Sequence, residues 1–300
     1  MRRNRPRSRP TRNLQAARSL PQVAVYHPDS QMLHPLRLVR EMWRDLLMSR
    51  DLAWQLMRRD ISAKYRQSVL GFLWAFLPAL IMAVGFTAAK GSGVVNIGNT
   101  DLPYPAYIMF SMTLWQTFVE ALNAPVQAVA TAKSMLSRIN FPREALILAK
   151  LGEIGFNFGI KFVFIVALFL WFRIPVTWSV LLAPVALIHL IAFGTFLGLL
   201  LAPIGALYQD VSMGLTLITG LWLFITPVVY PIPQTGPFAE IVKLNPVTPL
   251  LVTVRELATT GIISNPTGFW VCSAIALFGL LFAWVVYRLA LPFVVERISS

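Results

Sequence analysis

Long apolar segments alternate with short polar segments along most of this chain. A bilayer core about 30 Å thick is crossed by a helix of about 20 apolar residues, and segments of about that length recur after residue 70. The predicted spans are 71–89, 104–122, 145–172, 178–207, 212–231 and 267–289. The pattern therefore predicts an all-α integral membrane protein with six transmembrane helices, which together form a domain over 71–291.

The segment before the first span is amphipathic. Between residues 36 and 70, apolar side chains such as Trp43, Leu47, Trp54 and Met57 recur at helical spacing among arginine and aspartate. A helix of this kind lies at a membrane surface, with its basic residues toward the lipid headgroups. We expect one amphipathic interface helix, or a broken pair, on the cytoplasmic side. A solvated helix that packs on a partner protein is the alternative.

Two of the connecting segments are more than simple turns. Residues 123–142 predict a short amphipathic helix that ends at Asn-Phe-Pro and is suited to contact a cytoplasmic partner. Residues 231–266 contain six prolines, which divide a moderately apolar stretch into pieces too short to span. Irregular backbone is tolerated at membrane depth only where protein or a wet cavity surrounds it. We therefore expect short re-entrant helices between spans five and six, beside a conduit.

The composition supports a membrane location. Of the 300 residues, 56% are hydrophobic and 13% are charged, and the mean hydropathy is +0.64. These values exclude an ordinary soluble domain of this size. The single cysteine, Cys272, lies in an apolar run and is interpreted as a packing residue.

Positive charge is concentrated at the start of the chain. Arg66 is the fifteenth of 26 lysines and arginines. Because basic residues that flank a span are retained in the cytoplasm, the N-terminus and, after six spans, the C-terminus are predicted to lie there. We expect a multi-pass protein of the cytoplasmic (inner) membrane, with a disordered basic tail over 1–35 and a short C-terminal tail over 292–300. Anionic lipid, and not nucleic acid, is the expected counter-charge.

The sequence offers little catalytic chemistry. It contains no G-x-x-x-x-G-K-[ST] motif, so it does not bind nucleotide phosphates in the P-loop manner, and ATP hydrolysis would have to come from another protein. The three histidines are scattered, and no set of cysteine, histidine and carboxylate residues has the spacing of metal ligands. Acidic residues lie at or near the span ends, which disfavours a proton relay at the membrane midplane.

The third predicted span carries a polar stripe. Lys150, Glu153, Asn157 and Lys161 are spaced by three and four residues, so they share one face of a helix. Charges inside a span are costly unless they pair or face water. We expect Lys150 to pair with Glu153 near the cytoplasmic end and Lys161 to pair with another helix. Contact between this stripe and a transported substrate is the alternative.

Aromatic side chains suggest a route for a substrate. Sugar rings commonly stack on aromatic side chains, and the candidate residues of such a translocation path are Trp115, Phe118, Trp222, Phe224 and Tyr230. Anchoring of tryptophan and tyrosine at the membrane interface is the alternative explanation.

Several motifs resemble the membrane subunit of polysaccharide ABC exporters, the type 2 ABC family that moves O-antigen, capsule or teichoic acid chains. The resemblance extends over most of residues 36–291. Its motifs are RDISAKYRQSVLGFLW at 59–74, SMLSRINFPRE at 134–144, YQD at 208–210, TPVVYP at 226–231 and NPVTPL at 245–250. The resemblance depends on all of these motifs together, because they occur in this order along a chain with this predicted topology. Residues 1–35 depart from the pattern, because they are longer and richer in arginine than it requires.

The resemblance implies a homodimer of this subunit, bound to two copies of a separate cytoplasmic ABC ATPase. ATP and Mg²⁺ would be bound by that partner, so no cofactor is expected in this chain. The resemblance also implies a coupling helix within 128–142, seated in a cleft of the ATPase. Its candidate residues are Lys133, Ser134, Met135, Leu136, Arg138, Phe141 and Pro142. The corresponding residues of the interface helix are Arg59, Asp60, Lys64, Tyr65 and Arg66.

We therefore predict a transport subunit, not an enzyme, that exports a lipid-linked polysaccharide across the cytoplasmic membrane. A type 2 ABC exporter of a drug or small lipid would share every topological feature and is the first alternative. An intramembrane glycan-modifying enzyme is the second. It would need acidic residues or histidine gathered at one span end, whereas Asp101, Glu120 and Asp210 lie in separate segments.

Overall fold

The computed structural model describes residues 35–66, 71–95, 97–136 and 141–299. No strand occurs among these residues, which confirms the all-α class. The elements in chain order are α2 (Pro35–Met48), α3 (Arg50–Arg66), η1 (Gly71–Ala75), α4 (Leu77–Gly91), α5 (Tyr104–Thr131), α6 (Lys133–Leu136), α7 (Glu144–Trp171), η2 (Trp178–Leu182), α8 (Ala183–Leu207), α9 (Asp210–Ile225), α10 (Pro237–Leu244), α11 (Val247–Ala258) and α12 (Pro266–Ser299). Of the tail predicted over 1–35, residues 1–34 lie outside the described residues, and Pro35 is the first residue of α2.

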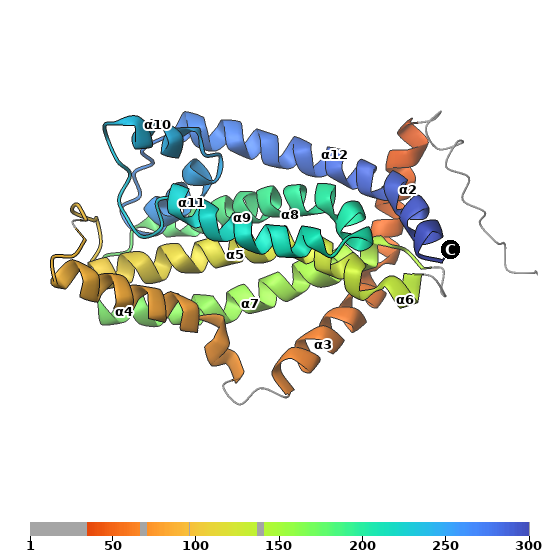
Figure 1. Cartoon of the computed structure of the whole chain (residues 1–300), viewed down its shortest axis with the longest axis horizontal. Helices are drawn as coiled ribbons and strands as arrows, with labels where there is room; N and C mark the ends of the chain where they lie inside the picture. Colours follow the sequence, from red (N-terminus) through yellow and green to blue (C-terminus); the bar gives the residue numbers. More distant parts are fainter. Residues whose placement is uncertain (1–34, 67–70, 96, 137–140, 300) are drawn as a thin grey trace, which may run out of the picture.

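The long helices run side by side along the longest axis of the molecule (Figure 1). At one end, α2 crosses the bundle close to α6 and to the C-terminus, and α10 and α11 lie at the opposite end (Figure 1). Helix α8 packs on both α5 and α12, and α3 packs on α7. The bundle therefore has two different ends, one bearing the N-terminal helices and the other bearing the short helices between α9 and α12.

Within the described part of the chain, three helical segments are long and apolar enough to cross a membrane, namely Glu144–Trp171, Trp178–Leu207 and Pro266–Arg297. Helices α4 and α9 are apolar but shorter. Large apolar side chains on the outer faces of these helices, including Val163, Leu170, Leu221 and Phe278, are exposed in the single chain. Each predicted span overlaps a helix, although the fifth, predicted over 212–231, is helical only to Ile225. The crossing of the membrane by all six stays a prediction.

The N-terminal amphipathic segment is a broken pair of helices, one of the two forms expected. The break between α2 and α3 falls at Ser49, which is fully buried and donates its hydroxyl to the carbonyl oxygen of Asp45 at 2.6 Å. Serine competes for backbone hydrogen bonds in this way and favours helix boundaries. Apolar residues of α3, Ala53 and Leu56, are buried with residues of the other helices in a cluster at this end of the bundle.

Helix α5 is longer than the sequence pattern predicted, because it continues from the expected end at residue 122 to Thr131. Of the short helix expected over 123–142, the described residues contain α6, with four residues, and residues 137–140 lie outside them. Pro125 lies inside α5, where it removes one backbone donor. Gly198 of α8 makes room for this proline, since a Cβ atom there would lie 2.9 Å from Pro125 Cδ and against the Leu122 carbonyl oxygen.

Prolines end α9 and separate the short helices after it. Thr226, which precedes Pro227, is extended and ends α9 at Ile225, as expected for a residue before proline. Helices α10 and α11 then occupy most of the stretch that was predicted to hold two short pieces. Helix α12 runs on to Ser299, so the predicted C-terminal tail is helical over its described residues.

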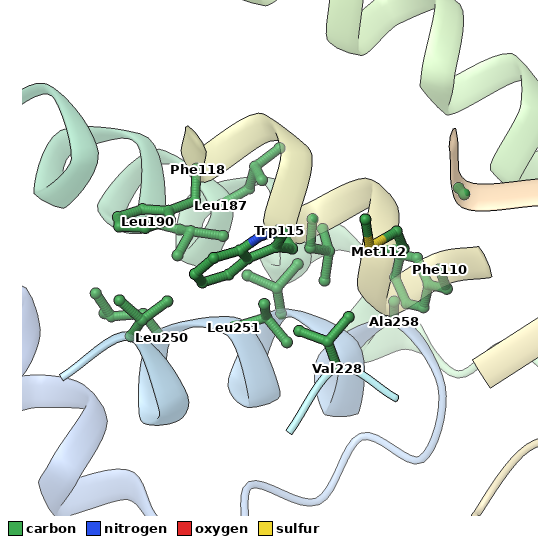
Figure 2. Close-up of a cluster of buried hydrophobic side chains, with 14 of the residues drawn as sticks. Phe110, Met112, Trp115, Phe118, Leu187, Leu190, Val228, Leu250, Leu251 and Ala258 are labelled. Atoms are coloured by element: carbon green, nitrogen blue, oxygen red, sulfur yellow. The ribbon is translucent and has the colours of Figure 1, made fainter. Parts of the chain in front are cut away.

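The main apolar core lies where α5, α8 and α11 meet. Figure 2 shows Trp115 of α5 between the leucines of α8, Leu187 and Leu190, and those of α11, Leu250 and Leu251, with Phe118 of α5 beside Leu190. All six side chains belong to the buried core of the single chain. This core holds the middle of α5 in a fixed position, and α5 provides one wall of the cavity described next.

Candidate functional site

A cavity of about 550 Å³ opens between η1, α4, α5, α7 and α9, beside the end of α3. Two indoles, those of Trp74 and Trp115, form part of its wall. Its polar lining includes the side chains of Lys64, Tyr65, Gln116, Glu120, Asn157, Thr216 and Thr219. A concave site with a mainly apolar wall and a few polar groups is the usual form of a ligand-binding site.

A chain of hydrogen bonds crosses one wall of this cavity. The Tyr65 hydroxyl donates to Asn157 Oδ1 at 2.9 Å, and Asn157 Nδ2 donates to Glu120 Oε2 at 3.5 Å. Lys161 Nζ donates to Glu120 Oε1 at 2.6 Å. The side chain of Lys161 is buried, and a buried ammonium requires such a partner. The prediction that Lys161 pairs with another helix is confirmed, because Glu120 belongs to α5.

A second set of charges joins α3 to α7 near the mouth of the cavity. Lys150 Nζ lies 2.7 Å from Glu153 Oε2 and 3.1 Å from Asp60 Oδ2. The other carboxylate oxygen of Glu153, Oε1, lies 3.4 Å from Lys64 Nζ. The predicted local pair between Lys150 and Glu153 is therefore confirmed. Asp60 of the interface helix is an additional partner that the stripe on α7 alone did not identify.

The electrostatic environment shifts two groups of α3. Burial raises the pKa of the Asp60 carboxyl, but hydrogen bonds and charge from Arg59 and Lys150 outweigh it, so the pKa lies below its usual value. Burial, together with the negative charges of Glu120 and Glu153, raises the pKa of the Tyr65 hydroxyl. Tyr65 thus remains a neutral hydrogen-bond donor toward the cavity at neutral pH.

Gln116 offers a hydrogen-bond donor that none of the described residues uses. Its Nε2 atom is buried and has no partner among the described residues, and the residue lines the cavity one turn before Glu120 on α5. A buried polar atom without a partner is uncommon and marks a place where a ligand or water can bind. The described residues contain no group of three or more His, Cys, Asp or Glu side chains that could hold a metal ion. The cavity is suited to bind a ligand by hydrogen bonds and stacking.

The structure brings together three of the five aromatic residues predicted to form a path. The ring of Trp115 lies 5.3 Å from that of Phe118 and 6.3 Å from that of Trp222, and Phe118 lies 5.5 Å from Trp222. Phe118 is 0% exposed in the single chain, whereas Phe224 is exposed. Tyr230 donates its hydroxyl to the Phe224 carbonyl oxygen. Only Trp115 of this group lines the cavity, and the path through all five stays a prediction.

The predicted coupling residues lie around α6, at the same end as α2. Leu136 is buried, and Met135 and Phe141 pack against the same apolar cluster. Lys133 begins α6, and Pro142 begins the turn before α7. The side chain of Ser134 and the whole of Arg138 lie outside the described residues. Of the interface-helix residues, Arg59 pairs with Asp60 at 2.8 Å, and Arg66 is the exposed last residue of α3.

The contacts of two arginines, the half-buried Arg288 and the buried Arg255, were missed by sequence reasoning. Arg288 of α12 donates to Glu144 Oε1 of α7 at 2.9 Å and to Asp45 Oδ2 of α2 at 2.7 Å, so it joins three helices at the α6 end. Its position inside a long apolar segment was the available signal. Arg255 of α11 is 5% exposed and donates to Ser111 Oγ at 2.9 Å and to the Pro227 carbonyl oxygen at 3.2 Å.

Comparison with known proteins gives a consistent result. Residues 51–259 match the family model described as ABC-2 type transporter. The O-antigen export system permease protein RfbA of Myxococcus xanthus is 28% identical over 231 residues, which cover 74% of this chain and 84% of that protein. A protein of the same name from Klebsiella pneumoniae is 24% identical over 223 residues, covering 71% and 82% of the two chains. A second Klebsiella pneumoniae protein of that name is 24% identical over 217 residues.

Proposed function

Because this chain belongs to the ABC-2 type transporter family, we propose that it is the permease subunit of an ATP-driven exporter of lipid-linked polysaccharide. The observation that carries the proposal is the match of relatives named O-antigen export system permease over more than two thirds of this chain. Long apolar helices in an all-α bundle agree with a multi-pass membrane protein. Polysaccharide of the O-antigen, capsule or teichoic acid type is the proposed cargo.

The proposed topology has six spans with both ends of the chain in the cytoplasm. The spans are α4, α5, α7, α8, α9 and α12. The basic helix α3, the short helix α6 and the C-terminus all lie toward one end of the bundle, which we assign to the cytoplasmic side of the inner membrane (Figure 1). Helices α10 and α11 at the opposite end are the proposed re-entrant helices on the external side.

Energy for export would come from a separate ABC ATPase, which binds ATP and Mg²⁺. Two copies of this subunit would associate with two copies of the ATPase. Helix α6 is the proposed point of contact, since it is short and follows directly from α5, so a force on α6 is transmitted to a helix that lines the cavity. Lys133, Met135, Leu136 and Arg138 are the proposed coupling residues.

The cavity is the proposed entrance for the glycan. Its indoles can stack on sugar rings, and the amide of Gln116 and the carboxylate of Glu120 can exchange hydrogen bonds with sugar hydroxyls. Lys64 and Glu120 are the charged residues among the described lining. Each has a partner behind the wall, since Lys64 pairs with Glu153 and Glu120 pairs with Lys161. The described lining thus carries one positive and one negative charge, which suits an uncharged polyhydroxylated chain.

A deletion of the gene tests this function in the cell. The account predicts that the lipid-linked glycan accumulates on the cytoplasmic side of the inner membrane and is lost from the cell surface, and that the intact gene restores it. Export of a drug or small lipid would instead leave the surface glycan at its normal amount and change resistance or lipid composition. That outcome would contradict the proposed cargo while leaving the family assignment intact.

A further inference from the structure

Six charged and two polar side chains form two adjacent sets of contacts between three helices. We name this set the polar ladder, and it comprises Asp60, Lys64 and Tyr65 of α3, Lys150, Glu153, Asn157 and Lys161 of α7, and Glu120 of α5. It has three carboxylates, three ammonium groups and two neutral side chains, in two sets of contacts. The outer set joins Asp60 and Lys64 of α3 to Lys150 and Glu153 of α7. The inner set joins Tyr65 of α3 to Asn157 of α7, and Asn157 and Lys161 to Glu120 of α5. The two sets are adjacent on α3, where Lys64 precedes Tyr65. The ladder therefore joins α3 to α5 through α7.

The outer part of the ladder fixes α3 against α7. Asp60 and Lys64 are four residues apart on α3, and Lys150 and Glu153 are three residues apart on α7, so each pair shares one helical face. Lys150 contacts Asp60, and Glu153 contacts Lys64, so two contacts cross between the helices. A slide or rotation of one helix against the other by a single turn would separate both pairs.

The inner part fixes α7 against α5. Glu120 accepts hydrogen bonds from Asn157 and Lys161, which lie four residues apart on α7. The ammonium of Lys161 is buried, and a movement that removed Glu120 would leave a buried charge without its partner, which is strongly unfavourable. A connected polar network of this kind favours one arrangement of its helices over nearby ones.

The ladder also reaches the proposed coupling element. Helix α5 continues from Glu120 through Thr131, and α6 begins two residues later at Lys133. Helix α3 approaches the same region from the other side, because Ala53 and Leu56 pack in one cluster with Leu136 of α6. Helices α3 and α6, which we place on the cytoplasmic side, are thus connected in two ways. They share the apolar cluster, and the polar ladder joins α3 to α5, which leads into α6.

We propose that the polar ladder makes α3, α7 and α5 move as one body, so that a displacement of α6 by the ATPase also moves the interface helix and the cavity wall. This inference rests on the proposed function, since it assigns a role within ATP-driven export. Asp60 and Lys150 are positioning residues in this scheme. They do not line the cavity, so their loss reduces coupling without removing a contact to the glycan.

The test uses the complex of this subunit with its ATPase in lipid vesicles. The double variant Asp60→Asn/Lys150→Met removes the ion pair between Asp60 and Lys150. Both residues become uncharged, so neither position keeps a charge without its partner. We expect stable assembly and normal basal ATP hydrolysis, but a loss of glycan-stimulated hydrolysis of about tenfold, a usual size for coupling between two sites. The exchange variant Asp60→Lys/Lys150→Asp restores opposite charges across the helices and is expected to recover most of the coupling.

The matched control removes another pair between a lysine and a carboxylate elsewhere in the protein. Lys243 and Glu240 pair at 2.9 Å on the exposed face of α10, and Glu240→Gln/Lys243→Met is expected to leave stimulation unchanged. Unchanged stimulation in Asp60→Asn/Lys150→Met, or an equal loss in the control, would overturn the proposal. A parent complex that neither hydrolyses ATP nor moves glycan would contradict the proposed function instead, because the ladder concerns only differences from an active parent.

A distance measurement keeps the proposal falsifiable even where the double variant does not fold. Spin labels at Ala63 of α3 and Gln127 of α5 occupy exposed positions at the two ends of the connection. In the otherwise unaltered complex, the distance between them is expected to stay constant when ATP is added. A shift of that distance with ATP would show that α3 and α5 move independently and would overturn the proposal.

Discussion

Lys161 and Glu120 form an ion pair in which the two partners differ in exposure. The ammonium and carboxylate lie 2.6 Å apart, but the Lys161 side chain is 1% exposed whereas that of Glu120 is 34% exposed. The carboxylate therefore connects a buried cation to the cavity. Substitution of Glu120 leaves the ammonium of Lys161 buried, whereas substitution of Lys161 leaves the carboxylate of Glu120 partly exposed. The two single substitutions should therefore lower the stability of the protein by different amounts.

Substitution of Glu120 is expected to destabilise the protein more than substitution of Lys161. Glu120→Gln leaves a buried ammonium without an anion, which costs about 3–5 kcal/mol. Lys161→Met leaves a carboxylate that water in the cavity can reach, so a smaller loss is expected. The double variant should recover much of the stability lost in Glu120→Gln. Thermal unfolding of the purified protein in one detergent measures this order, and a larger loss for Lys161→Met would contradict it.

The contact between α5 and α8 depends on a glycine. A Cβ atom at Gly198 would contact the Leu122 carbonyl oxygen and lie 2.9 Å from Pro125 Cδ, and backbone cannot move aside as a flexible side chain can. We expect Gly198→Ala to lower stability by about 1–3 kcal/mol, the usual cost of overpacking. Gly159→Ala is the matched control, because an added Cβ there meets nothing within 4 Å. Equal unfolding temperatures for the two variants would show that α8 can shift away from α5.

The turn after α9 is held by hydroxyl groups from α5. The Tyr107 hydroxyl donates to the Tyr230 carbonyl oxygen at 2.8 Å, and it lies 3.3 Å from the Pro227 carbonyl oxygen. Tyr107→Phe removes these contacts, and a net loss of about 1 kcal/mol is expected. Hydrogen exchange of the backbone over 226–230 should become faster while that of α8 is unchanged. Tyr208→Phe, at an exposed position, is the control and should have no effect.

The contact between α3 and α7 is expected to depend on pH in the acidic range. The pKa of Asp60 in the folded protein lies below its usual value. The carboxylate therefore contributes its full stabilisation above the unfolded pKa of about 3.9, and this contribution is lost as the pH falls through the lowered folded pKa. Exchange of the α3 amides should accelerate as the pH falls through that range, after correction for intrinsic rates. Asp60→Asn should weaken this dependence, and an unchanged profile in that variant would contradict the assignment.

Local features of this protein could be predicted from the sequence, because they depend on residues close together in the chain. The spacing of Lys150 and Glu153 was enough to predict their pair. The fifth span was predicted to run to residue 231, whereas α9 ends at Ile225, and Pro227 was the local signal for that end. The partner of Lys161 could be predicted only as another helix. Glu120 lies 41 residues away in sequence, and helical periodicity does not determine which spans pack together.

Two other features depend on tertiary packing and so were missed. The extension of α5 past residue 122 relies on Gly198 to accommodate Pro125, and α8 supplies that contact from a distant part of the chain. Arg255 resembles an ordinary exposed basic residue in the sequence. Its burial follows from Ser111 and the Pro227 carbonyl oxygen, which surround it only in the folded protein.

The most direct test of the central claim is transport by the purified complex. This subunit and its ATPase are placed in vesicles with the ATPase facing outward, and the lipid-linked glycan of the same cell is supplied on the outer leaflet. The account predicts that ATP moves glycan to the inner side only when both proteins are present, and that glycan stimulates hydrolysis. A stable, hydrolysing complex that ignores and does not move the glycan would contradict polysaccharide export by this protein.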